Sequence, residues 1–175
     1  MNNNDILIRL RYALDIKDTD MIDIFNLGGV TVTKEELQNI LMKSKIKGDT
    51  DLEEDDFDAN EDMKKCNNFM LESFLNGFII FKRGKQEPKP GEPAKPVFMI
   101  KDIKNVNNIV IKKLKIALSL TSDDMLDILK DAGTKISNSE LSAVLRKEDH
   151  RNYKECGDRY LKNFLKGLAI KYRKI

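Results

Sequence analysis

The chain has 175 residues, of which 41% are hydrophobic, and this is enough for a folded core and excludes an intrinsically disordered protein. Apolar stretches such as 77–81 are far shorter than the roughly 20 residues of a membrane span, which excludes a transmembrane helix. Charged residues make up 34% of the chain and aromatic residues 7%, a balance that favours amphipathic helices, so we expect an all-α fold.

The N-terminus and the cysteines indicate the compartment. Residues 1–5 carry no basic side chain, unlike the start of a secretory signal. The sequence has two cysteines, Cys66 and Cys156, which fits a reducing environment. We therefore expect a cytoplasmic protein.

The sequence contains an internal duplication. Residues 3–43 match residues 107–147 at a constant offset, and residues 66–83 match residues 156–173 at a shorter one. An acidic insertion near 48–62 accounts for the change of offset. The expected domains are helical repeat 1 at residues 1–85, a proline-rich linker at 86–105 and helical repeat 2 at 106–175.

The first helix of each repeat has apolar residues at helical spacing, and Asn4 or Asn108 is predicted to be its N-cap. A second apolar spot lies on the opposite side of this helix. A helix that is apolar on two sides needs two packing partners, so we expect two tandem four-helix repeats packed with pseudo-twofold symmetry. The predicted interface residues are Ile8, Tyr12, Ile109 and Ile116.

The second and third helices of each repeat have clear start signals. The second helix is expected to begin near Asp18 or Ser122. The third opens with a capping box at 33–36 and at 137–140, in which a hydroxyl and a carboxylate satisfy the free amides of the first turn. Both repeats therefore predict the same order of helices.

The fourth helix contains an interior glycine, Gly77 or Gly167. Glycine in a helix costs up to about 1 kcal/mol against alanine, so its presence predicts the close approach of another helix. All four prolines of the chain lie between residues 88 and 96, where they predict an extended linker. The apolar segment 97–100 that follows is expected to dock on a repeat.

Cys156 and His150 share a loop, and a cysteine with a histidine is the minimal nucleophilic pair. The matching loop of repeat 1 has no histidine, and no orienting third group is evident. Each cysteine also lies five residues before a leucine, the spacing of a hydrophobic staple at a helix start. We interpret both cysteines as hydrophobic staples or buried thiols at the start of the fourth helix.

Other catalytic or ligand-binding motifs are missing from the sequence. Two separated cysteines and one histidine cannot supply four zinc ligands, the acidic insertion fails the EF-hand pattern, and no phosphate loop is present. Four carboxylates near helix starts could serve an enzyme but are ordinary partners of the helix dipole: Asp20, Asp23, Asp124 and Asp127. We expect no enzymatic activity, no cofactor and no metal.

The two repeats differ in charge. Repeat 1 has 12 Lys+Arg and 17 Asp+Glu, which gives −5, whereas repeat 2 has 15 and 9, which gives +6. This asymmetry suits nucleic-acid binding by repeat 2, and equally attraction between the repeats or self-association. The nucleic-acid interpretation, with a helix-turn-helix-like second and third helix, assigns binding to Lys112, Lys113, Lys115, Arg146, Lys147 and Arg151.

The motifs in their order resemble the YehS-like family of bacterial proteins. The resemblance rests on Asn-Asn-Asp-Ile-Leu at 3–7, Leu-Arg-Tyr-Ala-Leu at 10–14, Glu-Cys-Gly-Asp at 155–158 and Asn-Phe-Leu-Lys-Gly-Leu at 163–168. It spans nearly the whole chain and implies a small bacterial cytoplasmic protein with a duplicated domain and no assigned function. It supplies no site residues.

The sequence therefore predicts a non-enzymatic helical module that binds another protein or itself. The alternative is a regulatory protein that binds nucleic acid through repeat 2, and a carboxylate-dependent enzyme is the less favoured third interpretation. No membrane partner is expected.

Overall fold

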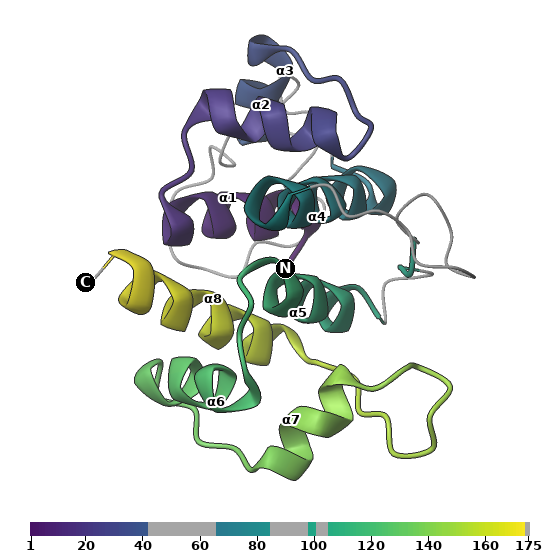
Figure 1. Ribbon diagram of the computed structural model, residues 1–175, viewed down its shortest axis with the longest axis vertical. Coiled ribbons are helices and arrows are strands. Elements are labelled where there is room, and N and C mark those ends of the chain that lie inside the picture. Colours follow the sequence, from purple (N-terminus) through teal and green to yellow (C-terminus); the bar gives the residue numbers. More distant parts are fainter. Residues whose placement is uncertain (42–65, 85–97, 101–104, 174–175) are drawn as a thin grey trace.

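A computed structural model describes residues 1–41, 66–84, 98–100 and 105–173 of the protein (Figure 1). Within these residues the protein is all α-helical, with eight helices and no strand. The helices are α1 (Asn3–Leu14), α2 (Asp18–Leu27), α3 (Lys34–Ile40), α4 (Asn68–Arg83), α5 (Val106–Ala117), α6 (Ser122–Asp131), α7 (Asn138–Leu145) and α8 (Asp158–Arg173).

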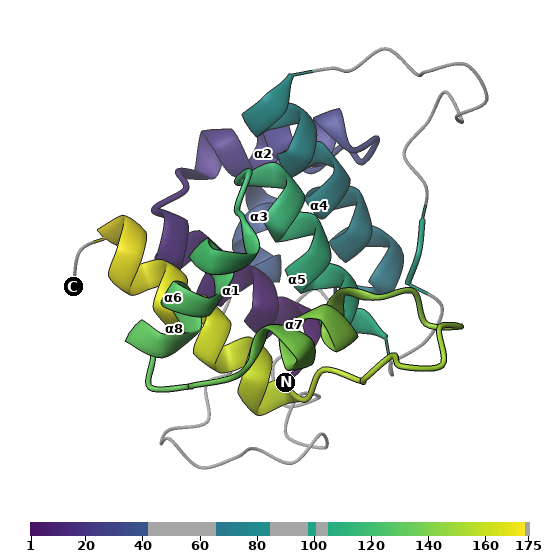
Figure 2. The same cartoon turned by 60° about the horizontal axis from the view of Figure 1, so that its bottom comes forward.

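The helices form three layers. Four of them, α1, α4, α5 and α8, lie in the middle, with α2 and α3 on one side and α6 and α7 on the other (Figure 1). In the middle layer α1 packs against α8 and α4 packs against α5, so both contacts join residues far apart in the chain. A second view shows the same two pairs side by side (Figure 2). Each half of the chain therefore contributes to a shared core.

Local capping explains where several helices begin. Asn2 and Asp5 form a capping box at the start of α1, and Thr33 with Glu36 forms the one predicted for α3. The prediction that Asn4 caps α1 is wrong, because Asn2 takes that position. At the start of α7, Ser137 accepts a hydrogen bond from the Glu140 backbone N–H, but the return bond to the Glu140 side chain is not formed, so the capping box predicted there is only half present.

Asn4 and Asn108 are instead buried inside their helices and bind the backbone of other segments. The Asn4 amide donates to the carbonyl of Ile40 at 2.9 Å and accepts from the backbone N–H of Cys66 at 2.9 Å. Asn108 makes the matching bonds to Val144 and Cys156 at 3.0 and 2.8 Å. Through these hydrogen bonds Asn4 holds the end of α3 and the residues before α4 against α1, and Asn108 holds the end of α7 and the residues before α8 against α5.

The interior glycines lie where two helices cross at close range. A Cβ atom at Gly77 would lie 1.8 Å from the carbonyl oxygen of Ile24 in α2, and one at Gly167 would lie 2.1 Å from that of Ile128 in α6. This confirms the predicted close approach. Because the obstacle is backbone rather than a movable side chain, no larger residue fits without separating the helices.

The acidic insertion and the prolines of the linker lie outside the described residues. The described end of the following segment docks as predicted. The backbone N–H groups of Met99 and Ile100 donate to the carboxylate of Glu72 in α4. Among the described residues no helix is long and apolar enough to cross a bilayer.

We predict that Gly77→Ala lowers the free energy of unfolding by about 2 kcal/mol, because the added methyl group forces α2 and α4 apart. Urea denaturation followed by circular dichroism measures the change. Gly157→Ala is the control, since a Cβ atom there meets nothing within 4 Å. Equal stability of the two variants would contradict the close-packed crossing.

Candidate binding surface

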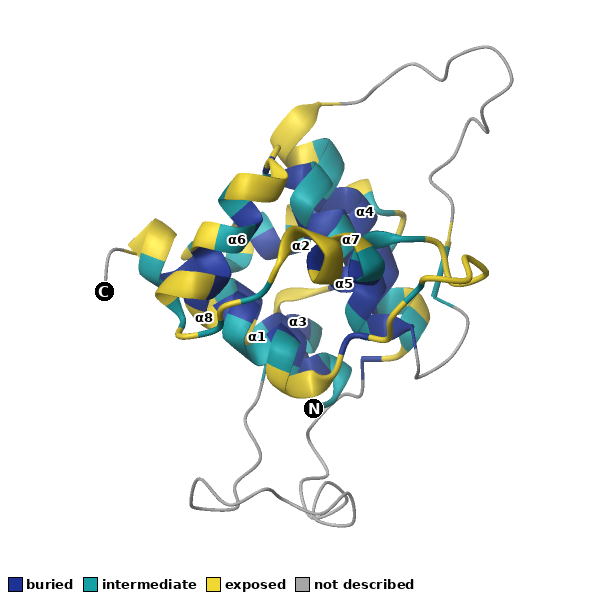
Figure 3. Ribbon diagram, turned by 90° about the horizontal axis from the view of Figure 1, so that it is seen from below, coloured by how far each residue is buried: buried dark blue, intermediate teal, exposed yellow. Residues whose placement is uncertain are grey.

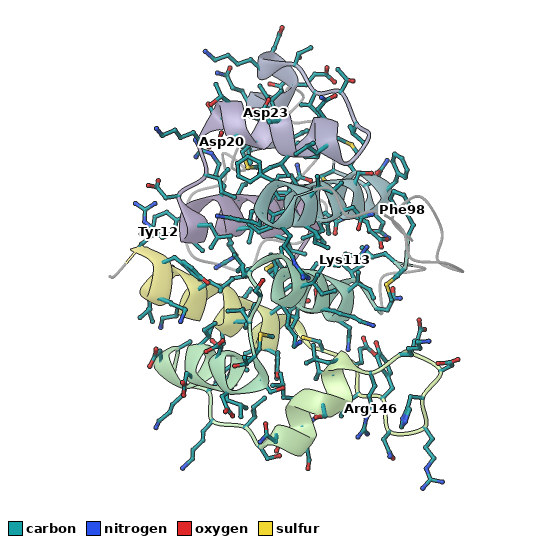
Figure 4. The ribbon with its side chains drawn as sticks, in the orientation of Figure 1. Tyr12, Asp20, Asp23, Phe98, Lys113 and Arg146 are labelled. Atoms are coloured by element: carbon teal, nitrogen blue, oxygen red, sulfur yellow. The ribbon has the colours of Figure 1, made fainter. Side chains whose placement is uncertain are left out.

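Two exposed phenylalanines stack on each other beside the contact of α4 with α5. The Phe69 side chain is 58% exposed and that of Phe98 is 46% exposed, and their ring centroids lie 5.1 Å apart with nearly parallel planes. Phe98 lies at the end of α4 in Figure 4. Large apolar rings that remain in water in adjacent positions are typical of an interaction site.

Glu72 holds the segment that carries Phe98. This side chain is 1% exposed, and its carboxylate accepts hydrogen bonds from Met99 at 2.5 Å and Ile100 at 2.8 Å. Asn105 supports the same segment through a 2.9 Å bond to the carbonyl of Met99. The position of Phe98 therefore depends on a buried charge in α4.

Lys113 of α5 neutralises that charge. Its ammonium group lies 3.0 Å from the Glu72 carboxylate and also donates to the side-chain oxygen of Asn76. Burial lowers the pKa of Lys113 below its ordinary value, and the hydrogen bond and charge of Glu72 oppose this shift. Figure 4 places Lys113 between α4 and α5, and Figure 3 colours much of these two helices as buried.

A cavity of about 260 Å³ opens beside Phe98. Its apolar walls come from Phe98, Met99, Ile109, Val144 and Tyr153. The charged walls are Lys112, Arg146, Lys147, Glu148 and Asp149, and Asn105 and Asn108 complete the lining. We call this cavity together with Phe69 and Phe98 the aromatic surface; it combines apolar walls with a small excess of positive charge.

The structure brings together part of the predicted nucleic-acid set. Lys112, Arg146 and Lys147 line this one cavity. Lys113 must be removed from the set, because it is 5% exposed and paired with Glu72, so it cannot reach a phosphate. The other two members, Lys115 on the half-buried side of α5 and Arg151 in an exposed turn, do not line the cavity.

The predicted interface residues divide between two places. Ile109 is buried and lines the aromatic surface, whereas Ile116 is half-buried on α5. Ile8 and Tyr12 line a different cavity, of about 530 Å³, where α1 meets the end of α8. There Tyr12 contacts Arg173, whose guanidinium lies 4.4 Å from the ring centroid and donates to the Tyr12 carbonyl at 3.0 Å.

The cations of this second cavity were not among the predicted site residues. Arg9, Arg11, Lys17 and Arg173 line it together with Asp15 and Ile16. The net charge of repeat 1 gave no indication of these cations, because the acidic insertion dominates the net charge of that half. The spacing of Arg9 and Arg11 can be read from the sequence. Their proximity to Arg173 cannot, because it depends on the packing of α1 against α8.

The residues considered as catalytic candidates are buried thiols, carboxylates on the outside of the molecule, or helix caps. Burial raises the pKa of the Cys66 and Cys156 thiols to about 12, so neither is a thiolate at neutral pH. Asp20 and Asp23 lie on α2 at the outside of the molecule (Figure 4), and Asp124 belongs to a capping box with Thr121. The described residues contain no group of three or more potential metal ligands of the His, Cys, Asp and Glu types.

The fold and these surfaces define an all-α protein with an exposed surface of aromatic and basic side chains. Comparison with known proteins gives the family. The chain belongs to the family described as "Protein of unknown function (DUF1456)", which matches residues 3–84 and 107–174.

A curated relative is similar over almost the whole chain. It is "Uncharacterized protein YehS" of Escherichia coli strain K12, 40% identical over 172 residues, which cover 98% of this chain and 96% of the relative. The resemblance to the YehS-like family is thereby confirmed. No solved structure matches the chain.

We predict that Glu72→Gln lowers the free energy of unfolding by about 3 kcal/mol, because it leaves the buried ammonium of Lys113 without a countercharge. Urea denaturation measures the loss, and adding Lys113→Met should recover part of it. Lys162→Gln is the control, since Lys162 occupies the matching position in repeat 2 and is half-exposed. A Glu72→Gln variant as stable as this control would show that the pair does not stabilise the fold.

Proposed function

We propose that the protein is a non-enzymatic binding module that holds a segment of a partner protein on the aromatic surface. The observation that carries this proposal is the exposed Phe98, which lines a preformed cavity and stacks on the exposed Phe69. The partner segment carries a large apolar side chain next to acidic residues.

The energetics of the two rings support a protein partner. Removing an aromatic side chain from water is favourable by roughly 25 cal/mol for each Å² of apolar surface. The fold buries most of its large apolar residues but leaves these two half-exposed and in contact. A partner that covers them gains this free energy without any change in the core.

The size of the cavity favours an anchoring side chain over a free small molecule. Sites for small molecules usually enclose about 300–1,000 Å³, and this cavity is smaller. An anchor that fills a pocket at the centre of an interface is the usual arrangement of a protein-binding hot spot. The cavity therefore suits one large side chain of a partner.

The charges favour an acidic partner. Lys112, Arg146 and Lys147 outnumber Glu148 and Asp149 around the cavity, and Asn105 already donates to Glu148 at 3.2 Å. Positive groups at the rim of an interface attract acidic segments and accelerate their association. The partner segment is thus expected to place Asp or Glu beside its apolar anchor.

The proposal includes a joint role for both repeats, packed as one body with pseudo-twofold symmetry. Exchanging the repeats would exchange the α1–α8 contact with the α5–α4 contact, and both contacts occur. Phe69 comes from the first half, whereas Ile109 and Arg146 come from the second. Neither half alone would supply the whole surface.

A cytoplasmic location and the absence of catalysis also belong to the proposal. Both cysteines are free thiols, as expected in a reducing compartment, and both are buried away from any substrate. The four carboxylates considered for an enzyme line neither of the two cavities described above.

We predict that a displayed peptide library selected on the purified protein yields sequences with an apolar anchor flanked by acidic residues. Phe69→Ser should weaken a selected peptide at least about tenfold, the loss of one anchor contact of about 1.4 kcal/mol. Fluorescence anisotropy measures the affinity. Phe81→Ser is the matched control, because Phe81 is an exposed phenylalanine near the other end of the same helix and, unlike Phe69, does not stack on Phe98.

Peptides that bind both phenylalanine variants equally, or a library without enriched sequences, would refute the proposed site. Sedimentation of the protein alone tests whether a second copy of the chain occupies the aromatic surface. A dimer that Phe69→Ser dissociates would mean that a second copy, rather than a different protein, covers the aromatic surface.

A further inference from the structure

The exposed face of α8 carries a row of cations. Arg159, Lys162, Lys166 and Arg173 follow one another at spacings of three, four and seven residues, which places them on one side of the helix. We call these four residues the basic row. At a rise of about 1.5 Å per residue the row is about 21 Å long. Arg159, Lys166 and Arg173 are exposed and Lys162 is half-exposed.

The acidic residues nearby are already engaged. Asp158, the sole carboxylate of α8, accepts hydrogen bonds from the Met1 amino group at 2.8 Å and from Asn107 at 2.8 Å. Asp15 binds Arg173 at 3.2 Å, and Asp18 binds Arg11 at 2.7 Å. In the described chain no carboxylate forms an ion pair with Lys162 or Lys166.

Helix α1 extends the row at its C-terminal end. Because α1 packs against α8, the 530 Å³ cavity collects Arg9, Arg11 and Lys17 around Arg173, the last member of the row. Arg11 is fixed by its bond to Asp18, and Arg173 by its bonds to α1. Several like charges held in fixed positions raise the local positive potential, and this attracts anions.

The matching face of repeat 1 shows that this charge is a particular property of α8. There the positions of Lys162 and Lys166 are Glu72 and Asn76, which neutralise and bind Lys113. On the α1–α8 side the position of Lys113 is occupied by Arg9, which is exposed. The positive charge is therefore compensated at one contact between the halves and left in solvent at the other.

We propose that the basic row, together with Arg9 and Arg11, binds the phosphate backbone of a single-stranded nucleic acid. This site lies on α8 and α1 and is separate from the aromatic surface. It also shares no residue with the helix-turn-helix-like surface predicted from the sequence.

Tyr12 favours a single strand over a duplex. Its ring is 52% exposed within the cationic cavity, and Arg173 lies over it. Single-strand binding grooves combine cations along the backbone with aromatic rings on which bases stack. Tyr12 is labelled in Figure 4 beside the C-terminal end of α8.

The test uses fluorescence anisotropy with labelled single-stranded DNA and RNA of about 16 nucleotides, a length that matches known single-strand sites. Arg11 and Arg173 are already bonded to carboxylates, so the other four cations are counted as neutralising one phosphate each. Four neutralised phosphates predict that affinity falls roughly 50-fold between about 50 and about 200 mM salt. The variant Arg9→Gln, Arg159→Gln, Lys162→Gln, Lys166→Gln should lose this binding and its salt dependence. Thermal denaturation verifies that the variant is folded.

The control replaces four exposed lysines outside both the row and the aromatic surface: Lys34, Lys130, Lys135 and Lys154, each by Gln. It removes the same charge and should retain most of the affinity. Equal loss in both variants would show a general effect of net charge and overturn the proposal. Binding of a duplex alone, or no binding at about 50 mM salt, would also overturn it.

Discussion

The buried pair of Lys113 and Glu72 is the interaction on which the described structure most depends. Two charges withdrawn from water cost several kcal/mol each unless they pair closely and their remaining hydrogen-bonding groups are satisfied. Glu72 meets this condition by also accepting two backbone N–H groups, and Lys113 by also donating to Asn76. One polar cluster thus connects α4, α5 and the segment that carries Phe98, so the core and the exposed surface are coupled.

Corresponding faces of α4 and α8 carry different side chains in the two halves of the chain. On α4 it presents Phe69, Glu72, Asn76 and Arg83, and on α8 the matching residues are Arg159, Lys162, Lys166 and Arg173. The first set binds α5 and leaves an aromatic pair in solvent. The second leaves a line of cations beside α1. The corresponding faces of α4 and α8 therefore differ both in charge and in burial.

Features that depend on local spacing could be predicted from the sequence. The capping box at Thr33 and the close crossing at Gly77 follow from residue type and position within a helix. The role of Asn4 was missed, although a polar residue on the apolar side of a helix in both repeats was a usable signal. The partner of Lys113 could not be predicted, because Glu72 lies 41 positions away in the chain and tertiary packing alone brings them together.

The central claim is that the two halves form one body joined through α4–α5 and α1–α8. The most direct measurement is to introduce a protease site into the linker at residues 88–96, cut it, and determine mass and unfolding by sedimentation and urea denaturation. We predict that the cut protein sediments as one particle of about 20 kDa and unfolds in a single transition. Separation into two folded halves would contradict the claim.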